Sequence, residues 1–351
     1  MNPSMTEGRR VGLGIIGYGP WGQHMARLAM NTTRAHIPLI WTRSTETAAL
    51  IRSHGFTPTH DVDELIGHPD VDAVAVLSPN ALHVEHCRKV AQAGKALLAT
   101  KPLAPTLEEC DRIIEAVDCA GITQHLDMSL RFSPPMRFLL EMMDSGTLGD
   151  PLHLIHRTSR ATGLYSTGRP HKAILHPEVS GGWIIHHMCH QVDYALRLIR
   201  RPVRQVYARG VRSDAACPSD ESVTALIEFE GGAMAEITDG VTLMDDHHFS
   251  LLTSQAQVSV DASRCLRMRR AEDMDATATP GYGGRSVCYT PEGWQDDSLV
   301  AFLSAVSGRP HGRPYALQTI PLREARPVMR VLLAIKQSAE TGQPVSLDSP
   351  P

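Results

Sequence analysis

The sequence predicts an α/β Rossmann domain with a doubly wound parallel sheet, followed by an α+β domain with a large open, mainly antiparallel sheet. Three observations support this fold class. Apolar runs typical of buried strands alternate with helical patterns over residues 1–128. A glycine-rich turn directly follows the first of these runs. Beyond residue 128 the apolar runs become short and partly alternating, as in antiparallel strands that expose one face.

Length and composition limit the classes of protein that this chain can be. Its 351 residues, 42% hydrophobic and 21% charged, fit two domains at 1–128 and 129–351, with a last helix at about 322–340 packing back at the domain interface. A net charge of -4 without a dense Lys/Arg run disfavours nucleic acid or an anionic membrane as partner. No apolar run can span a bilayer, no signal peptide is recognisable, and the seven cysteines form no Cys-x-x-Cys pair. We therefore expect a cytoplasmic protein that acts on a small molecule.

The glycine-rich turn has the sequence expected of a dinucleotide site. The strand predicted at residues 11–16 runs into Gly17-Tyr18-Gly19-Pro20-Trp21-Gly22, and a helical pattern follows through Met30. In such a motif the first glycine makes the tight turn, the second admits a pyrophosphate and the third lets helix and strand pack closely. The start of the helix offers free N–H groups and a positive dipole end to phosphates. This order of elements favours a dinucleotide site over a glycine-rich turn without a ligand.

The other strands of the first domain are expected at residues 37–41, 71–77, 96–100 and 122–128, separated by helical patterns. The helices between them are predicted to begin at the cap residues Ser44, Asn80 and Thr106. Ligands of such sheets bind at the carboxyl ends of the strands. The residues expected to face the cofactor are therefore Ser78, Pro79, Asn80 and Lys101.

The residues after the second strand favour NADP over NAD as the cofactor. An NAD-binding chain carries Asp or Glu here, which pairs with the ribose 2′-hydroxyl and repels a 2′-phosphate. This chain has Thr42-Arg43-Ser44, whose cation and hydroxyls suit the phosphate of NADP. The alternative is that Ser44 caps the next helix while Arg43 is solvated, and both can hold at once.

Titratable side chains of the second domain gather in residues 181–193. On one helix, His186, His190 and Asp193 form a stripe with Arg197, opposite an apolar stripe that suits a core. Within the same segment Trp183 can stack on a substrate ring, although a tryptophan in such a run is more often part of the core. The segment therefore shows a histidine face toward a ligand or a partner.

Basic residues elsewhere in the second domain favour an anionic substrate. Arg131, Arg160 and several basic residues between 169 and 176 add positive charge around the expected site. A carboxylated or phosphorylated substrate would be attracted by this charge. A solvated basic loop is the alternative interpretation.

Six segments, in this order and spacing, resemble the glucose-fructose oxidoreductase / inositol dehydrogenase / MocA (Gfo/Idh/MocA) family over essentially the whole chain. They are residues 17–22, 78–83 and 101–104, Arg131-Phe132 with Pro134, residues 146–149, and Gly181-Gly182 running to His190 and Asp193. The resemblance implies hydride transfer between NAD(P) and a secondary alcohol or carbonyl of a sugar, cyclitol or related small molecule. It also implies that the sheet of the second domain serves as the interface of a homodimer or homotetramer.

The resemblance assigns the catalytic roles to Lys101 and His190, and it adds His83 and Pro102 to the cofactor-binding segments. A histidine near neutrality suits the transfer of the hydroxyl proton, and a lysine can stabilise developing alkoxide charge. Which of the two carries the proton is left open.

The chain departs from the family pattern at two positions. Thr100 replaces the family glutamate before the lysine, and His186 replaces the aspartate that commonly holds a substrate hydroxyl. The second departure argues against a plain sugar or inositol. The sequence around His190 is similar to members that act on aromatic-acid dihydrodiols.

His186 has three interpretations. It replaces the family aspartate as a catalytic or substrate-binding residue, it forms a metal site with His190, or it has no ligand role. Asp193 is interpreted as the partner that orients His190. The complete set expected to bind substrate is Arg131, Arg160, Trp183, His186, His187 and Asp193.

Three other functions remain open: an NAD-assisted glycoside hydrolase or lyase, a metal-dependent variant, and a non-catalytic NADP sensor.

Overall fold

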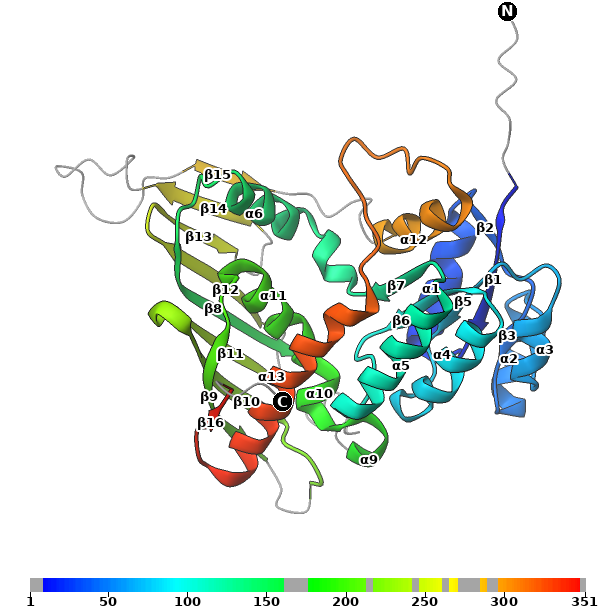
Figure 1. The fold of residues 1–351 in the computed structure, drawn as a ribbon, viewed down its shortest axis with the longest axis horizontal. Helices are drawn as coiled ribbons and strands as arrows, with labels where there is room; N and C mark the ends of the chain where they lie inside the picture. Colours follow the sequence, from blue (N-terminus) through cyan, green and yellow to red (C-terminus); the bar gives the residue numbers. More distant parts are fainter. Residues whose placement is uncertain are drawn as a thin grey trace, which may run out of the picture. The chain divides into compact units, whose positions relative to one another are not determined.

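The computed structural model describes residues 9–160, 176–212, 217–241, 246–260, 265–270, 285–288 and 296–347. The chain divides into two compact units (Figure 1). The first comprises Met1–Ser129 and Gly293–Arg326, and the second comprises Leu130–Glu292 and Pro327–Pro351. The change of unit near residue 129 lies close to the expected boundary. The return of residues 293–326 to the first unit differs from the expectation that every residue after 128 belongs to the second.

The first unit is built around a parallel sheet in the order β4-β3-β1-β5-β6-β7, with β2 also paired to β1. The strands are β1 (Val11–Ile16), β2 (Ala35–His36), β3 (Ile40–Trp41), β4 (Pro58–Thr59), β5 (Ala73–Val76), β6 (Ala96–Thr100) and β7 (Gln124–Asp127). The helices are α1 (Pro20–Asn31), α2 (Thr45–Ser53), α3 (Val62–Gly67), α4 (His83–Gln92), α5 (Leu107–Ala120) and α12 (Asp297–Ser307), with 3-10 turns η1 (Asn80–Leu82) and η5 (Leu322–Glu324). The predicted doubly wound Rossmann architecture is confirmed.

Two of the three predicted helix caps are present. Ser44 accepts a hydrogen bond from the Thr47 N–H at 3.1 Å at the start of α2. Thr106 accepts from the Glu109 N–H at 3.2 Å and donates its hydroxyl to the Glu109 carboxylate, as in a capping box. The prediction for Asn80 was wrong, because the chain first turns through η1 and α4 begins only at His83.

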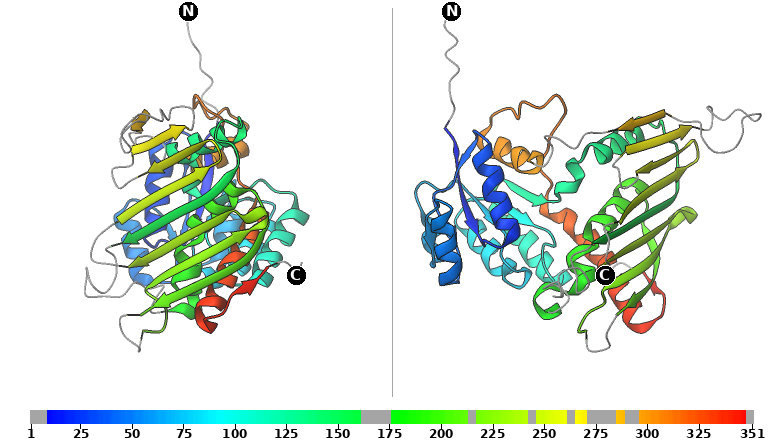
Figure 2. Two further views of the ribbon diagram at one scale, coloured as in Figure 1. Left: turned by 90° about the vertical axis from the view of Figure 1, so that its left-hand side faces the viewer. Right: turned by 180° about the vertical axis from the view of Figure 1, so that it is seen from behind.

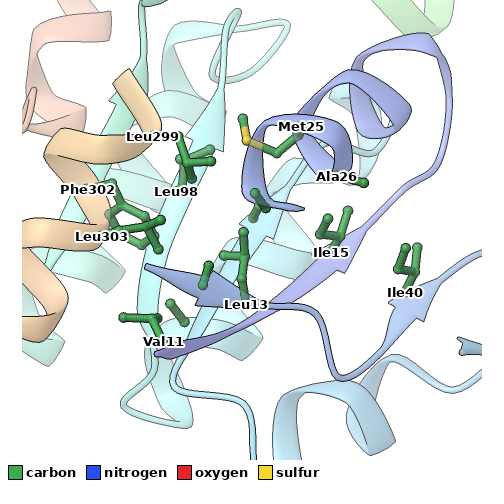
Figure 3. Packing of buried hydrophobic residues seen from close by; sticks show 14 of the residues in the cluster. Val11, Leu13, Ile15, Met25, Ala26, Ile40, Leu98, Leu299, Phe302 and Leu303 are labelled. Carbon is green, nitrogen blue, oxygen red and sulfur yellow. The ribbon is translucent and has the colours of Figure 1, made fainter. Parts of the chain in front are cut away.

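The core of the first unit joins the N-terminal strand to a segment almost 300 residues later (Figure 3). Leu13 and Ile15 of β1 belong to the same buried cluster as Leu299, Phe302 and Leu303 of α12. No helix was predicted at residues 297–307. Residues 297–303 are buried without a break, so the 3.6-residue alternation that marks an amphipathic helix is missing there.

The second unit contains a sheet with nine strands among its described residues, in the order β15-β14-β13-β12-β8-β11-β10-β9-β16 (Figure 2). All neighbours are antiparallel except β8 and β11, which confirms the predicted mainly antiparallel sheet. The strands are β8 (Pro151–Arg160), β9 (Val203–Val211), β10 (Ser222–Phe229), β11 (Met234–Val241), β12 (Asp246–Thr253), β13 (Ala256–Val260), β14 (Cys265–Arg270), β15 (Arg285–Cys288) and β16 (Val345–Ser346).

Helices cover one face of this sheet. Helix α11 (Cys189–Ile199) packs on the two central strands β8 and β11, and α6 (Pro134–Asp144) and α10 (Gly182–His187) contact α11 (Figure 1). The short helix α9 (Pro177–Ser180) contacts α10. The C-terminal helix α13 (Ala325–Thr341) corresponds to the helix expected at about 322–340, and a 3-10 turn η2 (Ser129–Phe132) leads from β7 to α6. Within the described ranges, no helix combines the length and apolarity that crossing a bilayer requires.

Candidate functional site

The glycine turn has the conformation that its three glycines predict. Gly17 has a φ of +104°, and a Cβ there would lie 2.7 Å from the Leu77 carbonyl oxygen. A Cβ on Gly22 would lie 2.2 Å from the Gly17 oxygen, so only glycine lets α1 approach β1 this closely. Within the described part of the chain, nothing lies within 4 Å of a Cβ built on Gly19. The open space therefore lies directly before the start of α1.

This open space fits a dinucleotide pyrophosphate. Gly19 precedes the first turn of α1 without a side-chain cap, and that turn contains no acidic residue. Backbone N–H groups and the positive end of the helix dipole thus face the open space. Pro20 and Trp21 are exposed beside it, whereas Tyr18 packs inward and its hydroxyl lies 2.9 Å from Nδ1 of His54. Tyr18 therefore lines the turn through its backbone.

A cavity of about 340 Å³ lies at the carboxyl ends of β3, β4 and β5. Arg43 is exposed at its edge, and Trp41, Val62 and Leu82 supply apolar walls. The remaining lining residues are His60, Asp61, Glu85 and His86. Thr42, by contrast, is buried and its hydroxyl accepts from the Ser44 N–H at 3.2 Å. Of the three residues expected to select the cofactor, Arg43 alone lines this cavity.

Ser78 and His83 form a buried support under the segment after β5. His83 is fully buried, with Nδ1 2.9 Å from the Leu103 carbonyl oxygen and Nε2 2.7 Å from that of Ser78. Both ring nitrogens are thus engaged by backbone, so His83 ties the segment after β5 to the segment after β6. The Ser78 hydroxyl bonds Nδ1 of His86 at 2.9 Å. Burial first, and then the charges of His83, Lys89 and Arg43, lower the pKa of His86 to about 4.

Lys101 follows β6 directly and is half-buried. The peptide bond to Pro102 is cis. Thr100 of β6 is paired with Asp127 of β7, so the acid lies one strand over from the lysine. Lys101 therefore lies at the carboxyl edge of the sheet, where ligands of such folds bind.

The histidine segment of the second unit is two helices, which corrects the prediction of one. Met188 has a φ of -70° and a ψ of -4°, and this turn-like ψ separates α10 from α11. The predicted stripe through His186, His190 and Asp193 therefore does not run along one unbroken helix. Gly181 and Gly182 both have φ values of +84°, which explains why glycines precede α10.

Asp193 pairs with Arg131, a partner that differs from the one predicted. The guanidinium donates from Nε and Nη2 to the two carboxylate oxygens at 2.7 and 2.5 Å. Both side chains are buried, with 9% of Arg131 and 2% of Asp193 exposed. The planar guanidinium matches a carboxylate in this two-bond geometry, which a histidine cannot form. The pair fixes α11 to the segment that precedes α6.

His187 has a buried acid beside it. Its Nδ1 lies 3.6 Å from Oδ1 of Asp239 on β11, and its ring stacks on Trp183 with centroids 4.2 Å apart. Asp239 also accepts a hydrogen bond from Gln191. Trp183 is fully buried, so it belongs to the core and supports His187. Asp239 could not be predicted as a partner, because it lies 48 residues from Gln191 and on another element.

His186 and His190 are both half-buried, and the His186 and His187 rings lie 6.0 Å apart. Among the described residues no group of three or more His, Cys, Asp or Glu side chains is arranged to hold a metal ion. The backbone of Arg160 ends β8, and its side chain lies outside the described part of the chain, as do residues 161–175.

Family comparison matches both units. A model described as "Oxidoreductase family, NAD-binding Rossmann fold" matches residues 11–127, and one described as "GFO/IDH/MocA C-terminal domain" matches residues 136–259. The 1,5-anhydro-D-fructose reductase of Ensifer adhaerens is 25% identical over 355 residues, covering 96% of this chain and 98% of that protein. The D-xylose 1-dehydrogenase [NADP(+)] of Haloarcula marismortui is 26% identical and covers 72% of each.

A third relative differs in its printed substrate. The 1-carboxy-3-chloro-3,4-dihydroxycyclohexa-1,5-diene dehydrogenase of Comamonas testosteroni is 32% identical over 179 residues, or 51% of this chain. This match spans less than half of that protein, 44% of its length. Among solved structures, levoglucosan dehydrogenase in complex with NADH and levoglucosan has the same fold, with a TM-score of 0.79, 20% identity, and coverage of 97% of this chain and 100% of that chain.

Proposed function

The chain belongs to the GFO/IDH/MocA oxidoreductases, and we propose that it is an NADP-dependent dehydrogenase or reductase. Its substrate would be a polar cyclic molecule that carries an anionic group and a secondary alcohol or carbonyl. The observation that carries the proposal is the glycine turn, with open space at Gly19 and an acid-free helix start beside it. The carboxyl edge of the same sheet carries Lys101.

The residues that would hold the cofactor fit a phosphorylated dinucleotide. The N–H groups at the start of α1 would bind the pyrophosphate, and Arg43 would pair with a 2′-phosphate in the cavity that it lines. NADP supplies a nicotinamide that accepts or donates a hydride. The absence of an acid at residues 42–44 supports NADP, since an acid there would repel the phosphate.

Two side chains would handle the substrate oxygen. In the oxidative direction, His190 would accept the proton of the substrate hydroxyl, and bound NADP would supply the acceptor for the hydride of the carbinol carbon. The family resemblance assigns to Lys101 the stabilisation of the developing negative charge. Reduction reverses both transfers, so protons and electrons balance in either direction.

Two observations support an anionic cyclic substrate. His186 stands where polyol-acting members of the resembled family carry an aspartate, and a protonated histidine would attract rather than repel a carboxylate. The Comamonas relative is named for a carboxylated dihydroxycyclohexadiene. Since Arg131 is already paired with Asp193, the anionic group would be held by His186, with Arg160 as a second donor.

The test is a nicotinamide absorbance assay with NADP and with NAD against carboxylated cyclic diols, cyclitols and sugars. We expect turnover to be faster with NADP and with the carboxylated diols. Lys101→Ala should lose activity while it keeps NADPH binding, which separates an enzyme from a non-catalytic NADP sensor. A clear preference for NAD would contradict the role given to Arg43.

The exposed face of the nine-stranded sheet supports a homodimer or homotetramer. Large apolar side chains lie exposed on this face: Tyr207, Leu226, Met234 and Leu252, between 39% and 43% exposed. Leu226 is opposite Tyr207, and His153 lies between Met234 and Leu252 in the strand register. Exposed apolar side chains clustered in this way mark interaction surfaces. Light scattering of Leu226→Glu against the unchanged chain would test it, with a monomer expected for the variant.

A further inference from the structure

A chain of buried hydrogen bonds in the first unit ends next to the glycine turn. Asp127, at the end of β7, is 2% exposed and accepts from the Trp21 indole N–H at 3.0 Å. Its other oxygen accepts from the Ser298 hydroxyl at 2.6 Å. Behind Ser298, Nε2 of His125 lies 2.9 Å from the Ser298 oxygen, and Nδ1 of His125 faces the N–H of Ile320 at 3.0 Å.

The direction of every bond in this chain can be assigned. The Ile320 N–H can only donate, so Nδ1 of His125 accepts and Nε2 carries the hydrogen. That hydrogen is donated to the Ser298 oxygen, which leaves the Ser298 hydroxyl to donate to Asp127. The Trp21 indole is likewise a donor only. Both oxygens of Asp127 therefore accept hydrogen bonds, as an ionised carboxylate does.

Positive charge lies close to this carboxylate. Asp127 interacts electrostatically with Lys101 and with His24, which is one turn after Trp21 on α1 and stacks obliquely on its ring at 4.8 Å. Burial raises the pKa of Asp127, while the bonds from Ser298 and Trp21 and the charge of Lys101 act against that rise. Because a proton on Asp127 would compete with the hydrogens that Trp21 and Ser298 donate to its two oxygens, the hydrogen-bond chain favours the ionised form.

The position of Asp127 relates to a departure from the family pattern. Thr100 stands where the resembled family carries a glutamate before the lysine. Asp127 is paired with Thr100 in the register of β6 and β7, so a carboxylate from the neighbouring strand lies beside the position that lacks one.

We propose that Asp127 is a positioning residue for Lys101. Its buried carboxylate, fixed by Trp21 and Ser298, holds the ammonium of the lysine at the carboxyl end of β6. The same carboxylate fixes the indole of Trp21 at the glycine turn, and Ser298 makes α12 part of the support. This inference rests on the proposed function for the catalytic role of Lys101, but the electrostatic interaction of Asp127 with Lys101 is tested without turnover.

The first experiment measures the protonation of Lys101 directly. Asp127→Asn keeps the size of the side chain and removes its charge. Acetic anhydride labels only uncharged amines, so peptide mass spectrometry across a pH series gives the midpoint for Lys101, with Lys89 as an internal reference. We expect the midpoint to fall by about one pH unit, because the ammonium loses a neighbouring negative charge. Asp118→Asn is the matched control, since Asp118 also accepts a side-chain bond, from Gln124 at 3.0 Å, but is exposed.

Activity provides a second readout. In Asp127→Asn, kcat/KM measured at saturating NADPH should fall about tenfold or more, because the lysine loses its neighbouring negative charge. Ser298→Ala removes only the hydroxyl donor and should shift the labelling midpoint in the same direction by a smaller amount. It also decides the question if Asp127→Asn does not fold.

An unchanged Lys101 labelling curve in folded Asp127→Asn, or in Ser298→Ala if the first variant does not fold, would overturn the inference. It would show that Asp127 serves only the packing of α12 and Trp21. If the unchanged protein turns over none of the substrates tested, the proposed function fails, and the labelling curves still decide the role of Asp127.

Discussion

The glycine turn of the first unit and the histidine segment of the second are built in different ways. At the turn, Gly22 meets Gly17 within the same loop, and the left-handed φ of Gly17 adds a second local requirement for glycine, although Gly17 also lies against Leu77, 60 residues further along the chain. In the histidine segment, the partners come from far along the chain: Arg131 is 62 residues from Asp193, and Asp239 is 48 residues from Gln191. The conformation of the turn is thus marked by glycines that the sequence displays together, whereas the side-chain pairs of the histidine segment depend on the fold of the whole unit.

The largest effect expected from this comparison is at Gly22. Gly22→Ala places a Cβ 2.2 Å from the Gly17 oxygen, so α1 must move away from β1. We expect NADPH affinity to fall on the order of a thousandfold, equivalent to about 4 kcal/mol. Fluorescence titration with NADPH measures it. Gly19→Ala is the matched control: its Cβ meets open space, so the fold should be unchanged and only the room for a pyrophosphate reduced. Equal losses of NADPH affinity in Gly22→Ala and Gly19→Ala would show that the close approach of α1 to β1 at Gly22 has no special role.

The next effect is at the ion pair of the histidine segment. Arg131→Met leaves the carboxylate of Asp193 buried without its cation, which should cost about 3–5 kcal/mol of unfolding free energy. Urea unfolding measures the loss. In the double variant Arg131→Met/Asp193→Leu most of the stability should return, since both charges are removed together. If the single and double variants are equally unstable, packing rather than charge determines the loss.

A smaller effect is expected from pH, through a histidine of the second unit. His156 is buried against Tyr194 and Phe249, and burial, with the charges of His247 and His248, lowers its pKa to about 3. The folded protein therefore keeps His156 neutral, while the unfolded chain takes up a proton below about pH 6.5. The contribution of neutral His156 to the free energy of unfolding is complete above about pH 6.5 and is lost as the pH falls toward 3. Between pH 7 and 5 this loss should be about 2 kcal/mol. Urea unfolding at these pH values should show a smaller loss in His156→Phe; an equal slope in both proteins would assign the loss to other groups.

The smallest effect in free energy concerns the choice of cofactor. Arg43→Asp places an acid at the edge of the cavity, where it would repel a 2′-phosphate and accept from a ribose hydroxyl. We expect the ratio of kcat/KM for NADP to that for NAD to fall about tenfold, or about 1.4 kcal/mol. Arg52→Asp, on the last turn of α2, serves as a charge-matched control. A ratio that moves equally in both variants would exclude a specific role for Arg43.

Local signals predicted the first unit well. The bounds of β1 and β6 are those expected, and the caps at Ser44 and Thr106 form the predicted bonds. These features depend on apolar runs and on side chains a few residues apart, which a sequence displays directly. Asn80 did not follow the rule because a 3-10 turn precedes α4.

Features that depend on tertiary contacts were not predictable in this way. The break at Met188 involves neither proline nor glycine, so nothing in the sequence marks it. Asp193 was expected beside His190, its neighbour on the helix, but Arg131 offers a better geometric match. The helix α12 was missed because burial on all sides removes the periodic pattern. The roles of His186 and His190 stay predictions.

The return of residues 293–326 to the first unit affects how this protein is made. Leu299, Phe302 and Leu303 complete the core that begins with β1. On a ribosome, where domains fold as they emerge, the cofactor-binding unit cannot finish its core until nearly the whole chain has been synthesised. The second unit is completed later still, because it includes Pro327–Pro351, whose strand β16 pairs with β9. A fragment that stops near residue 129 would expose apolar surface on β1, and a nonsense mutation before codon 297 would impair the N-terminal unit as well as shorten the chain.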